Sequence, residues 1–228
     1  MMASFGMPFF VFMNTILNIR LKSENFVIIE FDNLPPLIVP KLLVYEMGLR
    51  KGDLLTEEML ESLNFENELY LCEQKALYYL GKRLHSTMEL KRKLYQKKFS
   101  KKVIEPVILK MKDLTYLDDK KYSELLVNES LNLRHDGLQK IKARLIEKGI
   151  AKELISEVLS YMLNDEIEAD NIKLTADRKL SSLKKRFTDK KEINQKLTAF
   201  LLSKGYSFSA IKNYFKNIDQ ETDLNEEY

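Results

Sequence analysis

The feature that most constrains this chain is an internal repeat in its C-terminal part. Pairs of aliphatic residues four positions apart recur at intervals of 51 and then 56 residues. These pairs are Leu90/Leu94, Ile141/Leu145 and Leu197/Leu201. Further positions keep the same offsets, among them Phe99, Ile150 and Tyr206, and the lysines Lys97, Lys148 and Lys204. A period of this length indicates tandem supersecondary units that share a continuous core.

Each repeat unit predicts three helices joined by short turns. In the first unit a helix is expected over residues 71–84, and Ser86 with Glu89 forms a capping box for the second helix. Ser100 is the candidate cap of the third helix, whose apolar residues recur at helical spacing. Three such short helices bury little apolar surface alone, so we expect each unit to be stabilised by stacking on its neighbours.

The composition supports helices rather than a many-turned β fold. Only 7 of the 228 residues are glycine and 5 are proline. Gly149 and Gly205 end the second helix of the later two units, where glycine adopts a left-handed conformation at little cost. Lys98 stands at this position in the first unit, with an expected penalty of about 1 kcal/mol.

The segment before the repeats has the pattern of a small α+β cap. Leu17, Ile19 and Leu21 alternate with polar residues, and β-branched and aromatic residues dominate the next short runs. The expected strands and helices cover residues 17–21, 26–31, 37–39, 40–48 and 56–63.

The apolar run at residues 5–13 is too short to span a bilayer, and it lacks the basic segment and cleavage site of a secretory signal. We interpret residues 1–13 as an extension or as a misassigned start with Met13 as the true first residue. The predicted fold is mainly α, with tandem three-helix repeats forming an elongated, curved array behind a small N-terminal β-hairpin/α cap. The predicted segments are the cap at 14–70, repeats at 71–116, 117–164 and 165–218, and an acidic tail at 219–228.

The residue inventory argues against an enzyme or a metal protein. Cys72 is the only cysteine, so neither an intramolecular disulfide nor a cysteine-based zinc site is expected, and the setting is a reducing one. His85 and His135 are expected to be solvated turn residues, and Cys72 to be a buried or half-buried thiol. The glycine spacing of phosphate-binding loops is missing from the sequence. We therefore expect no catalytic residue, no metal and no cofactor.

Charge is segregated along the chain. Between Lys82 and Lys112 there are eleven lysines or arginines against two glutamates, and five acids but no base lie between Asp219 and Glu227. Basic character recurs at corresponding places of all three units, which favours a polyanionic partner such as DNA or an acidic groove on a protein filament. The candidate binding residues are Lys91, Arg92, Lys93, Lys97, Lys98, Lys101, Lys102, Arg134, Lys140, Arg144, Lys148, Lys184, Lys185 and Arg186.

Within this set, Lys140, Arg144 and Lys148 recur every four residues and form one stripe opposite the apolar face of their helix. We expect this stripe to be solvent-exposed, and its replacement by glutamate to leave the protein folded. The alternative interpretation is that each lysine belongs only to a solvated helix face.

Several strings resemble the RecX family of recombination regulators. They are Ala76-Leu77-Tyr78-Tyr79-Leu80 followed by Arg83, Ser86 and Glu89-Leu90, then Tyr116-Leu117-Asp118-Asp119, Lys148-Gly149-Ile150, and upstream Gly48-Leu49-Arg50-Lys51-Gly52 with Leu55-Thr56. The resemblance covers about residues 14–218, with no counterpart for residues 1–13. These motifs are turns and caps, so it is their order and spacing that are specific.

The resemblance implies a cytoplasmic bacterial protein that acts in homologous recombination, DNA repair and the SOS response. RecX-like proteins bind the RecA filament on DNA in its helical groove and inhibit its ATPase, strand-exchange and co-protease activities. We expect RecA as the partner, contact with DNA directly or through RecA, no membrane association, and a monomer. A helical protein that binds DNA directly through a basic face is the alternative, and a membrane-associated scaffold is a distant third.

Overall fold

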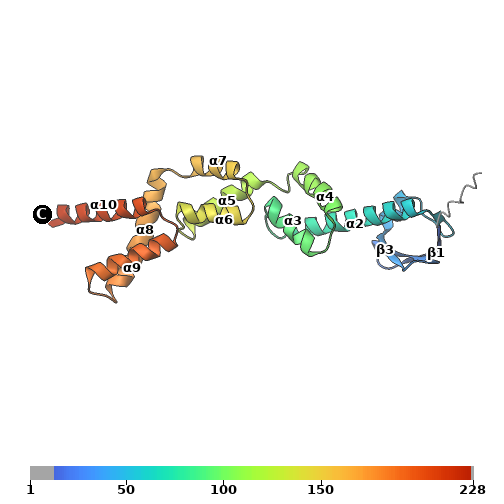
Figure 1. The fold of residues 1–228 in the computed structure, drawn as a ribbon, viewed down its shortest axis with the longest axis horizontal. Helices are drawn as coiled ribbons and strands as arrows, with labels where there is room; N and C mark the ends of the chain where they lie inside the picture. The colour runs from blue at the N-terminus through green and yellow to red at the C-terminus, as the bar shows by residue number, and fades with distance from the viewer. Residues whose placement is uncertain (1–12, 227–228) are drawn as a thin grey trace, which may run out of the picture. The chain divides into compact units, whose positions relative to one another are not determined.

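The computed structural model describes the backbone of residues 13–226 and the side chains of residues 13–218. The apolar run before Met13, and with it the question of the start, lies outside the described residues, as do the side chains of the acidic tail. Within the described part, four strands and ten helices follow in order (Figure 1). They form two compact units, one of residues up to Lys82 with Lys91–Met111, the other of Arg83–Leu90 with Lys112 onward.

The N-terminal cap is an antiparallel sheet with helix α1 (Lys41–Glu46) directly after its third strand. The strands are β1 (Asn14–Leu21), β2 (Phe26–Phe31), β3 (Leu37–Pro40) and β4 (Leu54–Leu55), in the order β3-β2-β1-β4. Ile16, Ile29 and Val39 are buried in its core. The alternation predicted for the first strand was wrong in part, because Leu17 and Leu21 are 50% and 65% exposed and the pairing register shifts between Ile16 and Asn18. Sequence reasoning missed the two-residue strand β4, because two residues carry no periodicity.

Helix α2 (Glu57–Leu80) corrects the expected division of this region. The sequence predicts one helix ending near Leu63 and a second beginning at residue 71, but the structure has a single helix of 24 residues. Thr56 caps it by accepting a hydrogen bond from the backbone N–H of Met59. Leu63 packs in the core of the cap, while Cys72 and Ala76 are buried farther along the helix. One rigid element therefore joins the cap to the first repeat.

The first repeat continues with α3 (Thr87–Gln96) and α4 (Lys101–Asp113). The Ser86 hydroxyl caps α3 by accepting from the Glu89 N–H at 3.1 Å, which confirms one half of the predicted capping box. The Glu89 carboxylate accepts from Arg83 and not from the Ser86 N–H. The prediction for Ser100 was wrong. Its hydroxyl donates to the Glu68 carboxylate of α2 at 3.0 Å, and its N–H does so at 2.6 Å, so Ser100 anchors the turn instead of capping α4.

The second and third repeats have the predicted helices. Asp118 caps α5 (Asp119–Asn132) and Asp189 caps α9 (Lys190–Ser203), each through two backbone N–H groups. The remaining helices are α6 (Leu138–Glu147), α7 (Lys152–Met162), α8 (Asp165–Lys184) and α10 (Phe208–Glu226). Leu94, Leu145 and Leu201 are fully buried, which confirms them as equivalent core positions of the repeat.

The turns between helices also follow the sequence register. Lys98, Gly149 and Gly205 all have positive φ, at 69°, 74° and 87°. The second and third repeats meet where Gly137 lies against Gly205, with the Gly137 N–H donating to the Lys204 carbonyl at 2.8 Å. A Cβ on Gly137 would lie 2.5 Å from the Tyr206 nitrogen, so only glycine permits this backbone approach.

Candidate partner-binding surfaces

The turn between α3 and α4 carries a cluster of exposed lysines. Lys97, Lys98, Lys101 and Lys102 are all exposed, and no carboxylate among the described side chains pairs with them. Lys101 and Lys102 lie in the first turn of α4, which contains no acidic residue. A helix N-terminus carries partial positive charge, so cations there cost stability, typically a few tenths of a kcal/mol or more each. Folding does not account for this placement.

A tyrosine pair lies at the end of α2 in the same unit. Tyr78 is 51% exposed, and its ring meets that of Tyr79 edge-on with centroids 5.8 Å apart. The Lys82 ammonium lies 4.3 Å from the Tyr78 centroid, and as hydrogen-bond partner and charge it lowers the pKa of the Tyr78 hydroxyl. Lys75 lies 4.6 Å from the same ring, and Lys93 lies 4.9 Å from the Tyr79 ring. This cluster combines aromatic surface with cations.

The sequence analysis missed this tyrosine–lysine cluster. The candidate binding residues predicted from the sequence include no aromatic residue. The available signal was the spacing of Lys75 and Lys82, which lie three residues before and four residues after Tyr78 and therefore share its helix face.

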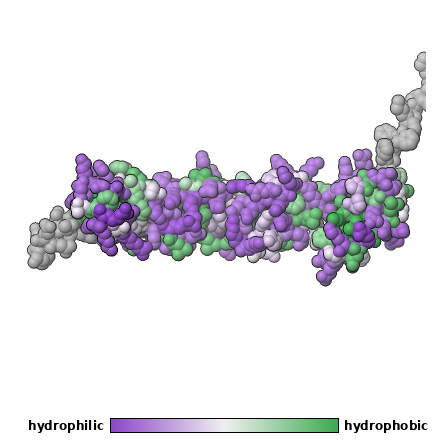
Figure 2. All heavy atoms as spheres, turned by 90° about the horizontal axis from the view of Figure 1, so that it is seen from below, coloured by the Kyte–Doolittle hydropathy of each residue, from purple (hydrophilic) through white to green (hydrophobic). Residues whose placement is uncertain are grey.

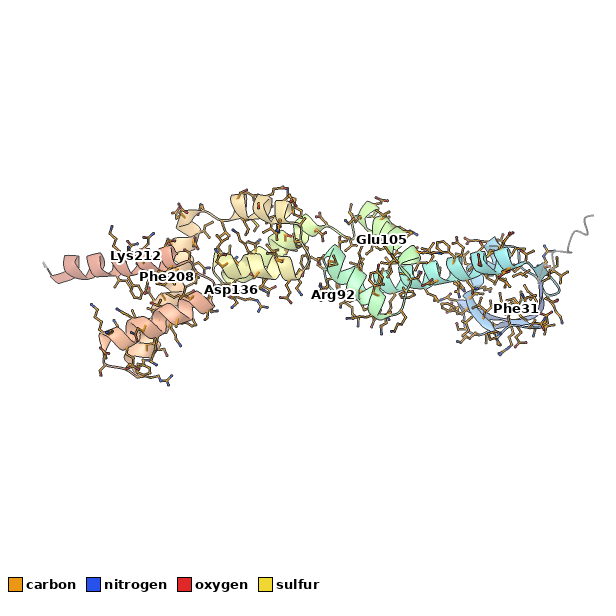
Figure 3. All side chains as sticks on the ribbon, viewed as in Figure 1. Phe31, Arg92, Glu105, Asp136, Phe208 and Lys212 are labelled. Carbon is orange, nitrogen blue, oxygen red and sulfur yellow. The ribbon has the colours of Figure 1, made fainter. Side chains whose placement is uncertain are left out.

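The remaining basic residues of α3 divide by their contacts. Lys91 forms an ion pair with Glu105 of α4 at 2.6 Å, and its side chain is only partly exposed. Arg92 is exposed on α3 (Figure 3). Lys93 lies against the Tyr79 ring as described above. Lys91 therefore contributes less net charge to the surface than the sequence suggests.

The stripe on α6 is not the open face that the sequence predicts. Arg144 is 22% exposed and donates to the Ser130 hydroxyl at 2.6 Å. Its guanidinium lies 3.6 Å from Asp136, whose side chain is only 2% exposed (Figure 3), and 3.8 Å from Glu129. Lys140 pairs with Asp136 at 3.1 Å. The expectation of a solvated stripe was wrong because the turn before α6 brings a buried carboxylate to it.

Lys148, the third residue of the stripe, belongs to a second network. Its ammonium lies 3.4 Å from Glu89, which also accepts two hydrogen bonds from Arg83 at 2.7 and 2.9 Å. The Arg83 hydrogen bonds hold the pKa of the Glu89 carboxyl at about 2, against the opposing effect of burial. The Lys148 carbonyl accepts from the Ser86 hydroxyl at 2.6 Å. These contacts join the loop before α3 to the end of α6.

The third repeat has its own exposed basic turn between α8 and α9. Lys184, Lys185 and Arg186 are exposed, with the Arg186 guanidinium 5.7 Å from the Phe187 ring centroid. Arg134, the remaining candidate, pairs with Glu129 at 2.7 Å but stays exposed. The visible face of the repeats is largely hydrophilic, whereas hydrophobic colour gathers over the cap (Figure 2).

The exposure of the two histidines and of Cys72 can be compared with the predictions made from the sequence. His85 is buried at 3% exposure, so the prediction of a solvated turn residue was wrong for it. Its Nδ1 lies 2.9 Å from the Arg83 carbonyl. His135 is partly exposed with a φ of 49°. Cys72 is buried as predicted, and desolvation raises the pKa of its thiol to about 12, which makes it a poor nucleophile.

Neither a metal centre nor a membrane span is present in the part of the chain that the structure describes. No three histidine, cysteine or carboxylate side chains there come close enough to hold a metal ion. None of the described helices combines the length and the apolar character needed to cross a bilayer.

The three-helix repeats match known proteins one by one. Models of the first, second and third three-helix domains of RecX match residues 72–111, 118–159 and 166–215. A protein of Clostridium acetobutylicum named Regulatory protein RecX is 34% identical over 211 residues, which cover 91% of this chain and 98% of that one. The Clostridium perfringens protein of the same name is 30% identical and covers 90% and 95%.

Two solved structures have the same fold. The crystal structure of a regulatory protein RecX matches with a TM-score of 0.69 at 21% identity, over 89% of this chain. The RecX structure from Lactobacillus salivarius matches with a TM-score of 0.62 at 24% identity, over 68% of this chain. The fold and the matched domains thus define a regulatory protein of tandem three-helix domains. The chain belongs to the RecX family.

Proposed function

We propose that this protein binds the RecA–DNA filament and inhibits its ATPase, strand-exchange and co-protease activities. It thereby acts in homologous recombination, DNA repair and the SOS response. Membership of a family of regulatory proteins supports the proposal. We infer that it works in the cytoplasm, as a monomer, and without catalytic activity of its own.

The observation that carries the proposal is the lysine cluster of the α3–α4 turn. Lys97, Lys98, Lys101 and Lys102 have no internal partner among the described side chains, and two of them oppose the dipole of α4. A charge cluster that the fold does not use is available to a polyanionic partner. Lys184, Lys185 and Arg186 offer a second exposed cluster in the third repeat. We assign the first contact to these two turns.

We assign a mainly structural role to the residues of the α6 stripe. Lys140, Arg144 and Lys148 already neutralise Asp136 and Glu89, so their attraction for an external anion is reduced. We propose that they hold the repeats in place and that any contact they make with the filament is secondary.

The direct test is the DNA-dependent ATPase rate of the RecA protein from the same organism, measured with and without this protein. We expect the rate to fall with increasing protein and to saturate. A rate that stays constant at a molar excess over RecA would refute the proposal. A protein whose α3–α4 lysines are replaced by glutamate serves as the matched comparison.

Direct binding to nucleic acid is the second candidate function. It is favoured by Tyr78 and Tyr79 among Lys75, Lys82 and Lys93, because aromatic rings with nearby cations suit unpaired bases and their phosphates. Binding to naked single strands measured at several salt concentrations separates the two functions. Phosphate-dominated binding falls steeply with salt, whereas filament binding with an apolar component falls less.

A further inference from the structure

A further basic site, of which the sequence predicted only Arg134, lies where the α5–α6 turn meets α8 and α9. A groove of about 290 Å³ is lined there by side chains from these three segments. Its polar lining includes Arg134, His135, Arg178, Lys179, Ser182 and Lys204, and no carboxylate lines it. All of these residues belong to one compact unit. Four cationic side chains thus converge on one concavity.

The charges of the groove are only partly neutralised. Arg134 pairs with Glu129 at 2.7 Å, and the Lys204 ammonium donates to the Arg134 carbonyl at 2.8 Å and lies 3.9 Å from Asp136. Arg178 and Lys179, by contrast, have no carboxylate partner among the described side chains. Two uncompensated cations in a concave site attract an anion more strongly than the same cations on an open helix face.

His135 links the cations to the fold. Its Nε2 lies 3.3 Å from Nη1 of Arg178, and because a guanidinium only donates, Nε2 accepts this hydrogen bond. Its Nδ1 therefore carries the proton and donates to Oδ1 of Asn171 at 3.1 Å. The His135 carbonyl accepts from the buried Tyr206 hydroxyl at 3.3 Å. These contacts hold Arg178 by one nitrogen and leave its other N–H groups for a ligand.

We propose that this groove binds a phosphate group. Guanidinium and ammonium donors are the groups that recognise phosphate oxygens, and the Ser182 hydroxyl adds a neutral donor. The volume lies at the lower limit of small-molecule sites, which suits a phosphate with an adjoining sugar rather than a whole nucleotide with its base. The phosphate comes either from a nucleic-acid backbone or from free phosphate. This phosphate site could exist whether or not the protein acts on RecA.

The test uses His135 as a local reporter in the full-length protein. The chain has two histidines, so their imidazole proton signals are assigned by comparison with a His135→Asn variant. The buried His85 serves as internal reference for folding. Inorganic phosphate should shift the His135 signal saturably without shifting that of His85. In R178Q/K179Q the apparent affinity should fall by about tenfold or more, because the variant cannot form the charge-assisted hydrogen bonds.

A matched control removes the same charge elsewhere in the unit. Lys152 on α7 and Lys212 on α10 are exposed and lie outside the groove, and Lys212 is marked in Figure 3. K152Q/K212Q should bind phosphate like the unmodified protein. A second variant, Ser182→Glu, leaves Arg178 and Lys179 in place but puts a carboxylate in the groove. It should abolish the His135 shift while the His85 signal reports an intact fold.

An oligothymidylate titration distinguishes the two sources of phosphate. If the ligand is a backbone phosphate, the oligonucleotide shifts His135, and R178Q/K179Q lowers the slope of log affinity against log salt by about 0.7 for each phosphate that the variant no longer neutralises. If only inorganic phosphate shifts His135, the site is one for free phosphate. A His135 signal that neither probe moves, or that moves equally in R178Q/K179Q, would overturn the proposal, whatever effect the protein has on RecA.

Discussion

The α3–α4 turn of the first repeat and helix α6 of the second are both rich in lysine and arginine, yet their cations make different contacts. The turn presents Lys97, Lys101 and Lys102 without a partner among the described carboxylates. On α6, Arg144 contacts Asp136, Glu129 and Ser130 instead. Cations in a basic stretch are therefore exposed without a carboxylate partner in the first repeat, and partly exposed and paired with carboxylates in the second.

The difference arises from carboxylates that lie far away in the sequence or on the preceding loop. Asp136 is buried in the turn before α6, and Glu89 reaches Lys148 across 59 residues. Buried carboxylates require partners, so the cations of α6 are needed by the fold itself. Charge counted along a helix does not distinguish these two roles, but the burial of the opposing acid does.

The largest expected effect contrasts Arg144→Glu with Lys101→Glu. The first change sets a carboxylate beside Asp136 and leaves the Ser130 hydroxyl without its donor, so we expect a loss of about 3 kcal/mol in the free energy of unfolding. The second places an acid in the first turn of α4, where the dipole favours it but Glu105 four residues later repels it, so we expect a change of less than about 0.5 kcal/mol. Urea unfolding followed by circular dichroism measures both. Equal stability of the two variants would remove the distinction between the regions.

Lowering the pH should weaken the network of Arg83, Glu89 and Lys148. The pKa of Glu89 is about 2 in the folded protein against an ordinary value of 4.5, so its contribution is fully present above pH 4.5 and is lost as the pH falls from there toward 2. Glu89 is 12% exposed but its partner Arg83 is half exposed, so we expect this contribution to be about 2 kcal/mol.

The measurement for this prediction is urea unfolding of the wild type and of Glu89→Gln between pH 7 and pH 3. The stability of the variant should be lower at pH 7 and should change less with pH. Glu46→Gln, at an exposed position of α1, is the control and should follow the wild type. Parallel curves for Glu89→Gln and the wild type would contradict the assigned role of the Arg83–Glu89–Lys148 network.

Much of the fold could be predicted from sequence, because local signals specify it. Periodicity places Leu94, Leu145 and Leu201 in the core, and capping chemistry places Asp118 and Asp189 at helix starts. These signals act within a few residues. The unbroken α2 was missed because the polar residues among positions 64–68 interrupt the apolar pattern. One of them, Asn67, is buried and donates to the Ile38 carbonyl of the cap at 3.0 Å.

The contacts of the candidate binding residues were less predictable, since they depend on residues that are distant in the sequence. The residues near Ser100 in the sequence do not show that the Glu68 carboxylate accepts a hydrogen bond from the Ser100 hydroxyl. Likewise, the residues near Arg178 do not show that His135 lies beside Arg178. The buried state of His85 likewise depends on packing around its loop. Lys97, Lys98, Lys101 and Lys102 are exposed as predicted, because no distant carboxylate among the described residues pairs with them.

A smaller effect is expected at Lys98, which sharpens the description of the α3–α4 turn. Its φ of 69° is a conformation that favours glycine, as found at Gly149 and Gly205. Lys98→Gly should therefore stabilise the protein by up to about 1 kcal/mol. Lys98→Ala removes the same charge but keeps a Cβ, so it should give no such gain. Thermal unfolding of both variants measures the difference, and a gain with alanine equal to that with glycine would assign it to charge instead of backbone strain.

The central claim is that the exposed lysines of the α3–α4 turn, which the fold does not use, serve the partner. The most direct measurement is RecA ATPase inhibition by K97E/K101E/K102E, with K22E/K41E/K51E as the control that reverses three exposed charges in the same unit. Circular dichroism should show both variants to be helical. The account predicts that the turn variant requires about tenfold or more protein for half inhibition, with a reduced dependence on salt, and that the control inhibits like wild type. Equal inhibition by the wild type and the turn variant would contradict it.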